Sequence, residues 1–489
     1  MELVALLPVL LVVLVLLLLY KYGTRNYGTL EKLGIPVIKP YPFVGSVPRP
    51  WRLYLREEDL RHAKQFNGVW GLYEGPTPQV FIADREMVKR IFIKDFSNFS
   101  ERFVANFYSS ATKDLLDMLV HDRWKVVRAI LTPALSTGAK LKAMMPTLEH
   151  CARDACTRLD QELLKSPVVQ IKDALFGPLV LDAVAQFTFG LKVPNISDST
   201  HPFVKAAKTF GGDEFSSPVI SGLLTFSPKL SSMLMSKFMA PPLQLLTDIL
   251  RKSVKERRAT GADRADLVGA LIDAIDNKVP TKEFRELDIT EDVLLLQGAN
   301  LLMDAYDTTG NTLSLCAYHL ATNPDVMARV LEEISGVELT YEALQQLPLL
   351  EAVMQEALRV SPFIPRHQRT CQRDWQCGNL RLPAGTCVTI PVWPLHLDPE
   401  VFPEPERFLP DRWLGEEGRQ LGQYNWMPFG LGPRACIGMR LATMEVKFVL
   451  AYVLQRYRLI AAPETKLVYR KGTSVFSGFY PIHIKVEKL

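Results

Sequence analysis

The order of apolar and polar positions divides the chain into an apolar run, a proline-rich stretch and a long body of mixed periodicity. Residues 3–20 form an unbroken apolar run of 18 residues. As a helix this run would span about 27 Å, close to a bilayer core of about 30 Å. Lys21 and Arg25 follow it, and positive charge there places the rest of the chain in the cytosol. We predict that residues 1–25 form one N-terminal transmembrane helix, a single-pass anchor.

The next segment is rich in proline. Five prolines lie between positions 36 and 50, and each one restricts φ and removes a backbone donor. We expect residues 26–50 to form a stiff, non-helical linker. Because no further linker or low-complexity stretch interrupts residues 51–489, we predict one globular unit there.

Short alternating segments of this unit predict strands. Residues 69–73 and 79–83 flank the turn Glu-Gly-Pro-Thr-Pro and predict a hairpin, and residues 385–392 predict a further strand. Most other segments have helical periodicity. The predicted fold class is mainly α with a small β-rich lobe.

The longest predicted helix begins after the N-cap residue Thr290 and ends at Asn323, before a proline. At 1.5 Å per residue it would be about 50 Å long and would cross the whole body. Halfway along it lies the sequence Asp-Ala-Tyr-Asp-Thr-Thr-Gly, residues 304–310. Polar side chains in a buried helix are costly unless they are hydrogen-bonded or functional. The segment therefore indicates either a structural network or a reaction site.

Charge and cysteine content limit the possible partners and metal sites. The formal net charge is only +4 and no nucleic-acid motif accompanies it, so we expect no nucleic-acid partner. The seven cysteines show neither a disulfide framework nor paired metal-ligand spacing. Cys436 must therefore be explained singly.

Cys436 lies in Phe-Gly-Leu-Gly-Pro-Arg-Ala-Cys-Ile-Gly, residues 429–438, directly before a predicted helix over residues 439–457. A thiol at a helix N-terminus is expected to favour the thiolate, a soft metal ligand. Gly432 and Gly438 would let the backbone approach a flat ligand, and Arg434 could pair with a carboxylate. The alternative is a buried structural cysteine.

The spacing of Phe429, Gly432, Arg434, Cys436 and Gly438 resembles the signature of the cytochrome P450 haem-thiolate monooxygenases. The resemblance covers nearly the whole chain. It implies the cytochrome P450 fold, with heme b as cofactor and Cys436 as the axial ligand of its iron. It also implies that Phe429, Arg434 and Gly438 contact the cofactor, and that NADPH contributes electrons only through a reductase.

Other positions of the family pattern lie far from this segment. Trp124 and Arg128 match its Trp-x-x-x-Arg, which hydrogen-bonds a haem propionate, and Arg366 matches a second propionate-binding position. The remaining matched residues are a fold-locking set, Glu356, Arg359 and Arg407, and residues of substrate-lining segments, Phe363, Ile364 and Phe476. Asp304 is also predicted to line the substrate, although it does not match the family pattern.

The polar segment of the long helix resembles the family pattern Ala/Gly-Gly-x-Asp/Glu-Thr, in which acid and alcohol deliver protons for the cleavage of dioxygen. Asp307 and Thr308 match these two residues. Ala305 departs from the pattern by adding a methyl group where the family has a glycine. Asp304 departs from it with a carboxyl group one turn before Thr308. Asp304 would bond to a backbone or water partner, anchor a substrate hydroxyl or amine, or form a haem ester as a glutamate does in fatty-acid hydroxylases.

The resemblance implies a monooxygenase of the endoplasmic reticulum membrane that acts on a lipophilic xenobiotic, steroid or fatty acid. Its partners would be the bilayer and a reductase that docks on a basic proximal face near Arg123, Lys125 and Lys140. Two alternatives remain, an isomerase or dehydratase of oxygenated fatty acids and a non-catalytic haem carrier or sensor.

Overall fold

The structure is a computed structural model that describes residues 2–46, 55–102, 109–209, 228–261, 266–279, 281–470 and 478–489. In residues 2–7 and 228–231 it describes the backbone alone. Phe476, predicted to line the substrate, lies outside the described residues.

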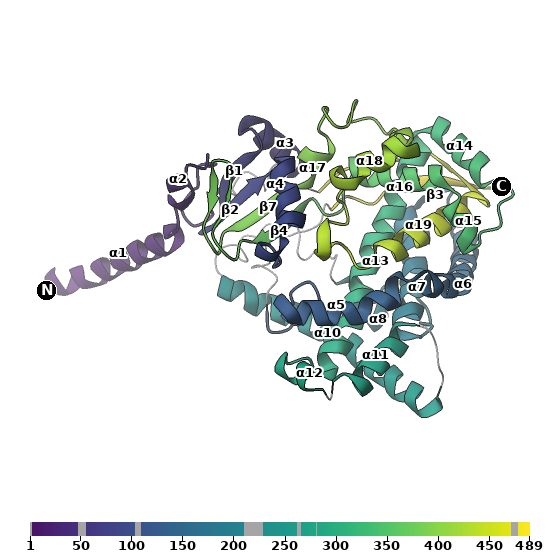
Figure 1. Cartoon of the computed structure of the whole chain (residues 1–489), viewed down its shortest axis with the longest axis horizontal. Helices are drawn as coiled ribbons and strands as arrows, with labels where there is room; N and C mark the ends of the chain where they lie inside the picture. The colour runs from purple at the N-terminus through teal and green to yellow at the C-terminus, as the bar shows by residue number, and fades with distance from the viewer. Residues whose placement is uncertain are drawn as a thin grey trace.

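Helices dominate the described chain, with a β lobe on the side nearest the N-terminus (Figure 1). The mainly α fold class with a small β lobe is confirmed. The longer helices are α5 (His121–Ser136), α6 (Gly138–Leu163), α7 (Gly177–Phe189), α10 (Pro228–Thr260), α13 (Glu291–Thr322), α16 (Pro348–Val360) and α19 (Met439–Leu454). Shorter helices include α2 (Thr29–Lys32), α3 (Leu55–Gln65), α8 (Pro202–Lys208), α11 (Leu267–Asn277), α14 (Pro324–Ile334) and α18 (Gly415–Asn425).

The β lobe is built on one four-stranded sheet. Its order is β1 (Val69–Glu74), β2 (Thr77–Ile82), β7 (Cys387–Pro391) and β4 (Arg366–Thr370), in which β2 and β7 are parallel and the other pairs antiparallel. The predicted hairpin and the strand near residue 390 are confirmed. Two smaller sheets join β3 (Val168–Gln170), β9 (His483–Lys488) and β8 (Tyr457–Ile460), and β5 (Trp375–Cys377) with β6 (Leu380–Leu382).

The proline-rich stretch is part of the β lobe. Val37 forms a parallel bridge with Gly71 of β1, and Gly45 bridges Glu74. Leu30 and Ile35 are buried in the hydrophobic cluster of the lobe. The described part of the predicted linker therefore packs on the body, because its apolar side chains find partners there.

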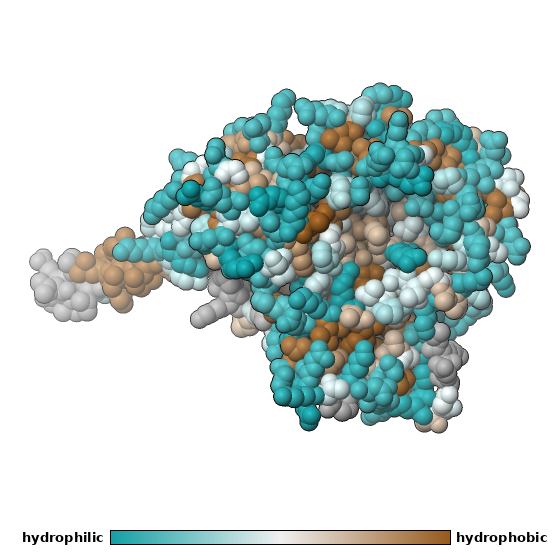
Figure 2. All heavy atoms as spheres, in the orientation of Figure 1, coloured by the Kyte–Doolittle hydropathy of each residue, from teal (hydrophilic) through white to brown (hydrophobic). Residues whose placement is uncertain are grey.

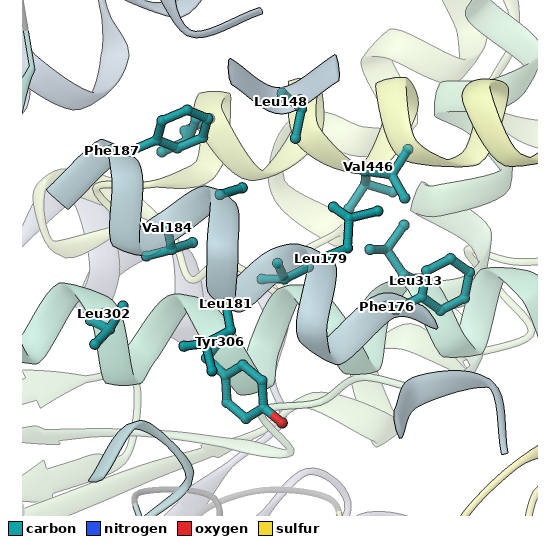
Figure 3. Packing of buried hydrophobic residues seen from close by; sticks show 14 of the residues in the cluster. Leu148, Phe176, Leu179, Leu181, Val184, Phe187, Leu302, Tyr306, Leu313 and Val446 are labelled. Atoms are coloured by element: carbon teal, nitrogen blue, oxygen red, sulfur yellow. The ribbon is translucent and has the colours of Figure 1, made fainter. Parts of the chain in front are cut away.

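The long central helix forms as predicted. Thr290 caps α13 by accepting a hydrogen bond from the Val293 amide at 3.4 Å, and the helix ends before the proline. It packs against α7, where Leu181 and Val184 face Leu302 and Tyr306 (Figure 3). Within residues 304–310, Tyr306, Asp307 and Thr309 are buried, whereas Asp304, Ala305 and Thr308 are half-buried.

The apolar N-terminal run is also helical. Helix α1 (Glu2–Thr24) projects from the β lobe, and its large apolar side chains from Val9 to Tyr20 are exposed by 44 to 61% (Figures 1 and 2). Within the residues that the structure describes, no helix is both long enough and apolar enough to cross a membrane.

Candidate functional site

The loop before Cys436 is closed by its own backbone and packed against a neighbouring turn. The Cys436 amide donates to the Phe429 carbonyl at 2.8 Å. Gly432 has φ +71°, and a Cβ there would lie 2.1 Å from the Phe92 carbonyl oxygen. Gly432 is therefore required for close packing on the turn η1 (Arg90–Lys94), which explains the residue without the flat ligand that the sequence suggested.

The Cys436 thiol is accessible although it lies deep in the protein. Burial raises its pKa to about 11, and the backbone N–H of Gly438 only partly offsets that rise. For the free thiol, the helix terminus alone does not offset burial, because loss of water outweighs one N–H dipole. A bound metal cation would reverse this balance, since a coordinating thiol is deprotonated outright.

Arg434 links the loop to the chain before α5. Its guanidinium is 2% exposed and donates to three backbone carbonyls, those of Ser100, Leu116 and Leu119. It stacks on Trp124 of α5, with Cζ 4.1 Å from the ring centroid. Burial and the nearby charge of Arg102 lower the pKa of Arg434 to about 9.

Three more arginines, Arg102, Arg128 and Arg369, lie near Arg434. Arg128 donates to the Ala435 carbonyl at 2.8 Å, and Arg102 pairs with Asp117 and donates to the Arg434 carbonyl at 3.2 Å. Burial, with Arg102 and Arg434 as repelling neighbours, lowers the pKa of Arg369 well below its usual value. The Arg369 Nε has no hydrogen-bond partner among the described residues.

Arg366 occupies a different environment. Its guanidinium donates to both carboxylate oxygens of Asp59, at 2.6 and 3.0 Å, and stacks over Phe81. The Arg366 position predicted to bind a propionate is thus committed to a buried ion pair, and Arg369 faces the arginine cluster instead. Arg369 was missed because the count of seven residues after Arg359 selected a side chain on the other face of strand β4.

This environment fits a flat dianionic cofactor. Arg102, Arg128, Arg369 and Arg434 repel one another in a buried region, where unpaired charge is costly unless anions compensate it. Two carboxylates of a bound group would supply that charge and would give Arg369 Nε its acceptor. The accessible thiol of Cys436 adds one soft ligand for iron.

The central segment of α13 turns its polar groups in different directions. Thr308 Oγ1 donates to the Asp304 carbonyl at 2.6 Å. Asp307 Oδ1 accepts from Lys172 Nζ at 2.6 Å, whereas Oδ2 has no partner among the described residues. Burial and the neighbouring Asp117 carboxylate raise the pKa of Asp304, and an ionised Asp304 would in turn raise the pKa of Cys436.

The fold-locking set differs from the prediction in one member. Glu356 and Arg359 are fully buried and joined by two hydrogen bonds of 2.8 Å. The third member is Arg412, whose Nε lies 3.0 Å from Glu356 Oε1. Arg407 is wrong as the predicted partner, because its exposed side chain pairs with Glu404 and only its carbonyl reaches Arg359.

The remaining predicted positions lie close to this site or on its surface. Phe363 is buried and Ile364 is half-buried, both in the connection from α16 to β4 that leads to Arg369. On the face of α5, Lys125 is exposed, whereas Arg123 is turned toward Asp114 and the Asp288 carbonyl. Arg123 therefore adds little to a basic surface.

Comparison with known proteins agrees with this geometry. Residues 36–483 match the family Cytochrome P450. This chain belongs to the cytochrome P450 family. The P450 is 32% identical to Cytochrome P450 3A29 of Sus scrofa over 94% of this chain and 92% of the relative. It is 31% identical both to Cytochrome P450 3A12 of Canis lupus familiaris, over 98% and 96%, and to Cytochrome P450 3A5 of Homo sapiens, over 96% and 95%.

Family membership makes this P450 a monooxygenase of the oxidoreductase class. Members bind haem iron through a cysteine thiolate and use NADPH through a reductase.

Proposed function

We propose that this P450 inserts one oxygen atom of O2 into a lipophilic small molecule of xenobiotic, steroid or fatty-acid type, with electrons from an NADPH-dependent reductase. The observation that carries the proposal is the accessible Cys436 beside four arginines that repel one another, of which Arg102 alone has a carboxylate partner among the described residues. The alcohol of α13 belongs to the same interior, since Asp304, one turn before Thr308, would raise the pKa of Cys436 when ionised.

In this proposal Cys436 ligates haem iron, and Arg102, Arg128, Arg369 and Arg434 hold the two carboxylates. When bound, haem supplies the redox chemistry that activates dioxygen. Trp124 keeps Arg434 in place by stacking, so that the guanidinium does not have to be ordered on binding.

Asp307 and Thr308 are proposed to handle protons. Lys172 holds Oδ1 of Asp307, which leaves Oδ2 to accept and release a proton. Thr308 donates its hydroxyl proton to a helix carbonyl, and its oxygen retains lone pairs that can accept from water or substrate.

Asp304 and its neighbour Asp117 are proposed to contact the substrate. Their mutual influence favours a protonated Asp304, which can donate to a substrate hydroxyl or share its proton with an amine. Phe363 and Ile364 would supply apolar contact on the β4 side. In spectral titrations Asp304→Ala should reduce affinity for hydroxyl- or amine-bearing ligands relative to hydrocarbons of similar size, and an unchanged preference would remove this role.

Two surfaces support the proposed cellular setting. The exposed apolar side chains of α1 support a membrane anchor, because exposing such a continuous apolar surface to water is energetically unfavourable. Exposed Lys125 on α5 and Arg440 on α19 flank the Cys436 loop and support docking of an acidic reductase there. We place the enzyme in the endoplasmic reticulum membrane with its body in the cytosol.

The direct test is turnover by purified holoenzyme with reductase, NADPH and a panel of steroids, fatty acids and drugs. Oxygen and NADPH consumption with formation of a hydroxylated product supports the proposal. Product formation from a lipid hydroperoxide without NADPH would indicate an isomerase or dehydratase. Haem binding with no turnover of either kind would indicate a carrier or sensor.

In Cys436→Ser the reduced carbonyl complex should lose its red-shifted thiolate band, because a hydroxyl is a poor ligand for haem iron.

A further inference from the structure

A tight turn of the β lobe presents an aromatic ring to helix α1. Tyr41 and Gly45 exchange backbone hydrogen bonds of 2.8 and 3.0 Å across residues 41–45. Phe43 lies at the tip with φ +69°, a left-handed conformation that a bulky side chain rarely adopts. The surrounding turn must therefore impose this conformation on Phe43.

Hydrogen bonds attach this turn to the sheet of the β lobe. The Ser46 amide donates to the Tyr73 carbonyl at 2.7 Å, and Ser46 Oγ donates to the Ile38 carbonyl at 2.6 Å. A Cβ at Gly45 would lie 2.1 Å from the Tyr73 carbonyl oxygen, so this approach requires glycine. The position of Phe43 is thus set by strand β1.

The Phe43 ring packs against α1 at a glycine. Among the α1 residues whose burial the structure describes, Gly23 alone is buried. A Cβ at Gly23 would lie 2.5 Å from Phe43 Cδ1, and the Tyr20 ring meets Phe43 edge-on at 6.4 Å. A larger residue at 23 would displace the aromatic ring.

Two hydrogen bonds support the same joint. Tyr27 Oη donates to the Tyr41 carbonyl at 2.8 Å, and Asn26 Nδ2 donates to the Pro76 carbonyl in the β1–β2 turn at 2.9 Å. The chain that leaves α1 is therefore attached on both sides of Phe43.

Aromatic side chains surround the joint on its outer surface. Tyr20, Tyr22 and Tyr41 are exposed by 51, 42 and 48%, and Tyr20 directly follows the exposed apolar side chains of α1 that end at Leu19. Aromatic residues with a polar tip prefer the boundary between membrane and water. Their position favours a lipid surface as the partner of this region.

We propose that Phe43 clamps α1 to the β lobe, so that α1 and the turn of residues 41–45 meet the same lipid surface and the catalytic body has a fixed tilt on the membrane. The clamp rests on the membrane anchor of the proposed function. The contact would hold α1 at a fixed angle to the body. Helix α1 is about 34 Å long at 1.5 Å per residue, so a small change of angle at Gly23 moves its far end by several ångströms.

The test compares holoenzyme variants in oriented phosphatidylcholine bilayers, with the tilt of the haem plane measured by polarised absorption. Phe43→Ala should shift or broaden the tilt, while flotation with vesicles and the reduced carbonyl spectrum stay as in the wild type. Val44→Ala, on the same turn, is the matched control and should keep the wild-type tilt. An unchanged tilt in Phe43→Ala overturns the clamp. A wild-type protein that does not float with vesicles overturns the anchor itself, and the clamp with it.

A second variant separates the contact from a general disturbance of the turn. Gly23→Ala should change the tilt when Phe43 is present, because the new methyl group displaces the ring. In the Phe43→Ala background, Gly23→Ala should add little. Independent, additive effects of the two substitutions would show that the residues do not act through one contact, and would overturn the proposal.

Discussion

Arg412 donates from Nε to Glu356 Oε1 at 3.0 Å, although Arg407 lies five residues earlier in a closely similar sequence. Pro405-Glu-Arg-Phe and Pro410-Asp-Arg-Trp both offer an arginine between an acid and an aromatic residue. Glu356 also accepts from the Trp413 indole and the Leu409 amide, at 2.8 and 2.9 Å. The second copy supplies two donors to this buried carboxylate, and the preceding Leu409 supplies a third.

This difference predicts unequal losses of stability. Arg412→Ala should lower the free energy of unfolding by about 3 kcal/mol, because it removes one partner of a buried pair and leaves the Glu356 charge less compensated. Arg407→Ala should cost much less than Arg412→Ala, since its pair with Glu404 is exposed and screened by water. Urea unfolding of the two holoproteins measures both values. Equal losses would contradict the assignment of Arg412.

The second prediction separates Arg369 from Arg366. Arg369→Gln should weaken haem binding about 10- to 100-fold, because charge-assisted hydrogen bonds contribute about 1.5–3 kcal/mol. It should not destabilise the apoprotein, in which neighbouring arginines already repel this guanidinium. Titration of apoprotein with haem, together with its unfolding curve, measures the two effects.

Arg366→Gln is the matched control for that experiment. It leaves the Asp59 carboxylate buried without its ion-pair partner and should lower stability by about 3 kcal/mol. The folded fraction should bind haem with wild-type affinity. The opposite result, normal stability with weak haem binding in Arg366→Gln, would restore Arg366 as the propionate ligand.

The third prediction concerns proton delivery by α13. Thr308→Ala should lower product formed per NADPH several-fold and raise hydrogen peroxide, because proton transfer to dioxygen becomes misdirected. Thr312→Ala is the matched control, since Thr312 makes the same type of hydrogen bond, to the Thr308 carbonyl at 2.8 Å. Both variants lose a similar helix contact, so a similar loss of coupling in both would assign the effect to the helix and not to the Thr308 hydroxyl.

The fourth prediction is a pH dependence of stability. Glu445 of α19 is 1% exposed, its Oε1 has no partner among the described residues, and burial raises its pKa from 4.5 to about 8. Between these two values the unfolded chain ionises Glu445 while the folded chain keeps it protonated, so its contribution disfavours folding increasingly as pH rises and levels off above about 8.

Glu445→Gln removes this titration. At pH 7 the variant should gain on the order of 3 kcal/mol over the wild type, because one pKa unit corresponds to about 1.4 kcal/mol. Near pH 4.5 the gain should fall to about 0.4 kcal/mol, since the wild-type residue is then protonated in the folded state and half protonated in the unfolded state. Unfolding curves between pH 4.5 and 8 test the slope, and a difference independent of pH would assign the effect to packing.

Local sequence determined the elements of this P450 and the identity of its central residues. Alternation around Glu74 and Thr77 produced the hairpin, and the cap at Thr290 began the long helix, because such signals involve residues a few positions apart. The loop around Cys436 was recognisable for the same reason. Its glycines and arginine stand at short, fixed separations.

Tertiary structure decided which of two equivalent residues acts. Arg366 and Arg369 are three apart on strand β4, so their side chains leave opposite faces, and only the packing of the sheet determines which face looks toward Cys436. Arg407 was the arginine selected from the sequence, but the folded chain brings Arg412 to Glu356 instead. The pKa of Cys436 likewise depends on burial by residues remote in sequence, which raise it where the local helix terminus alone would lower it.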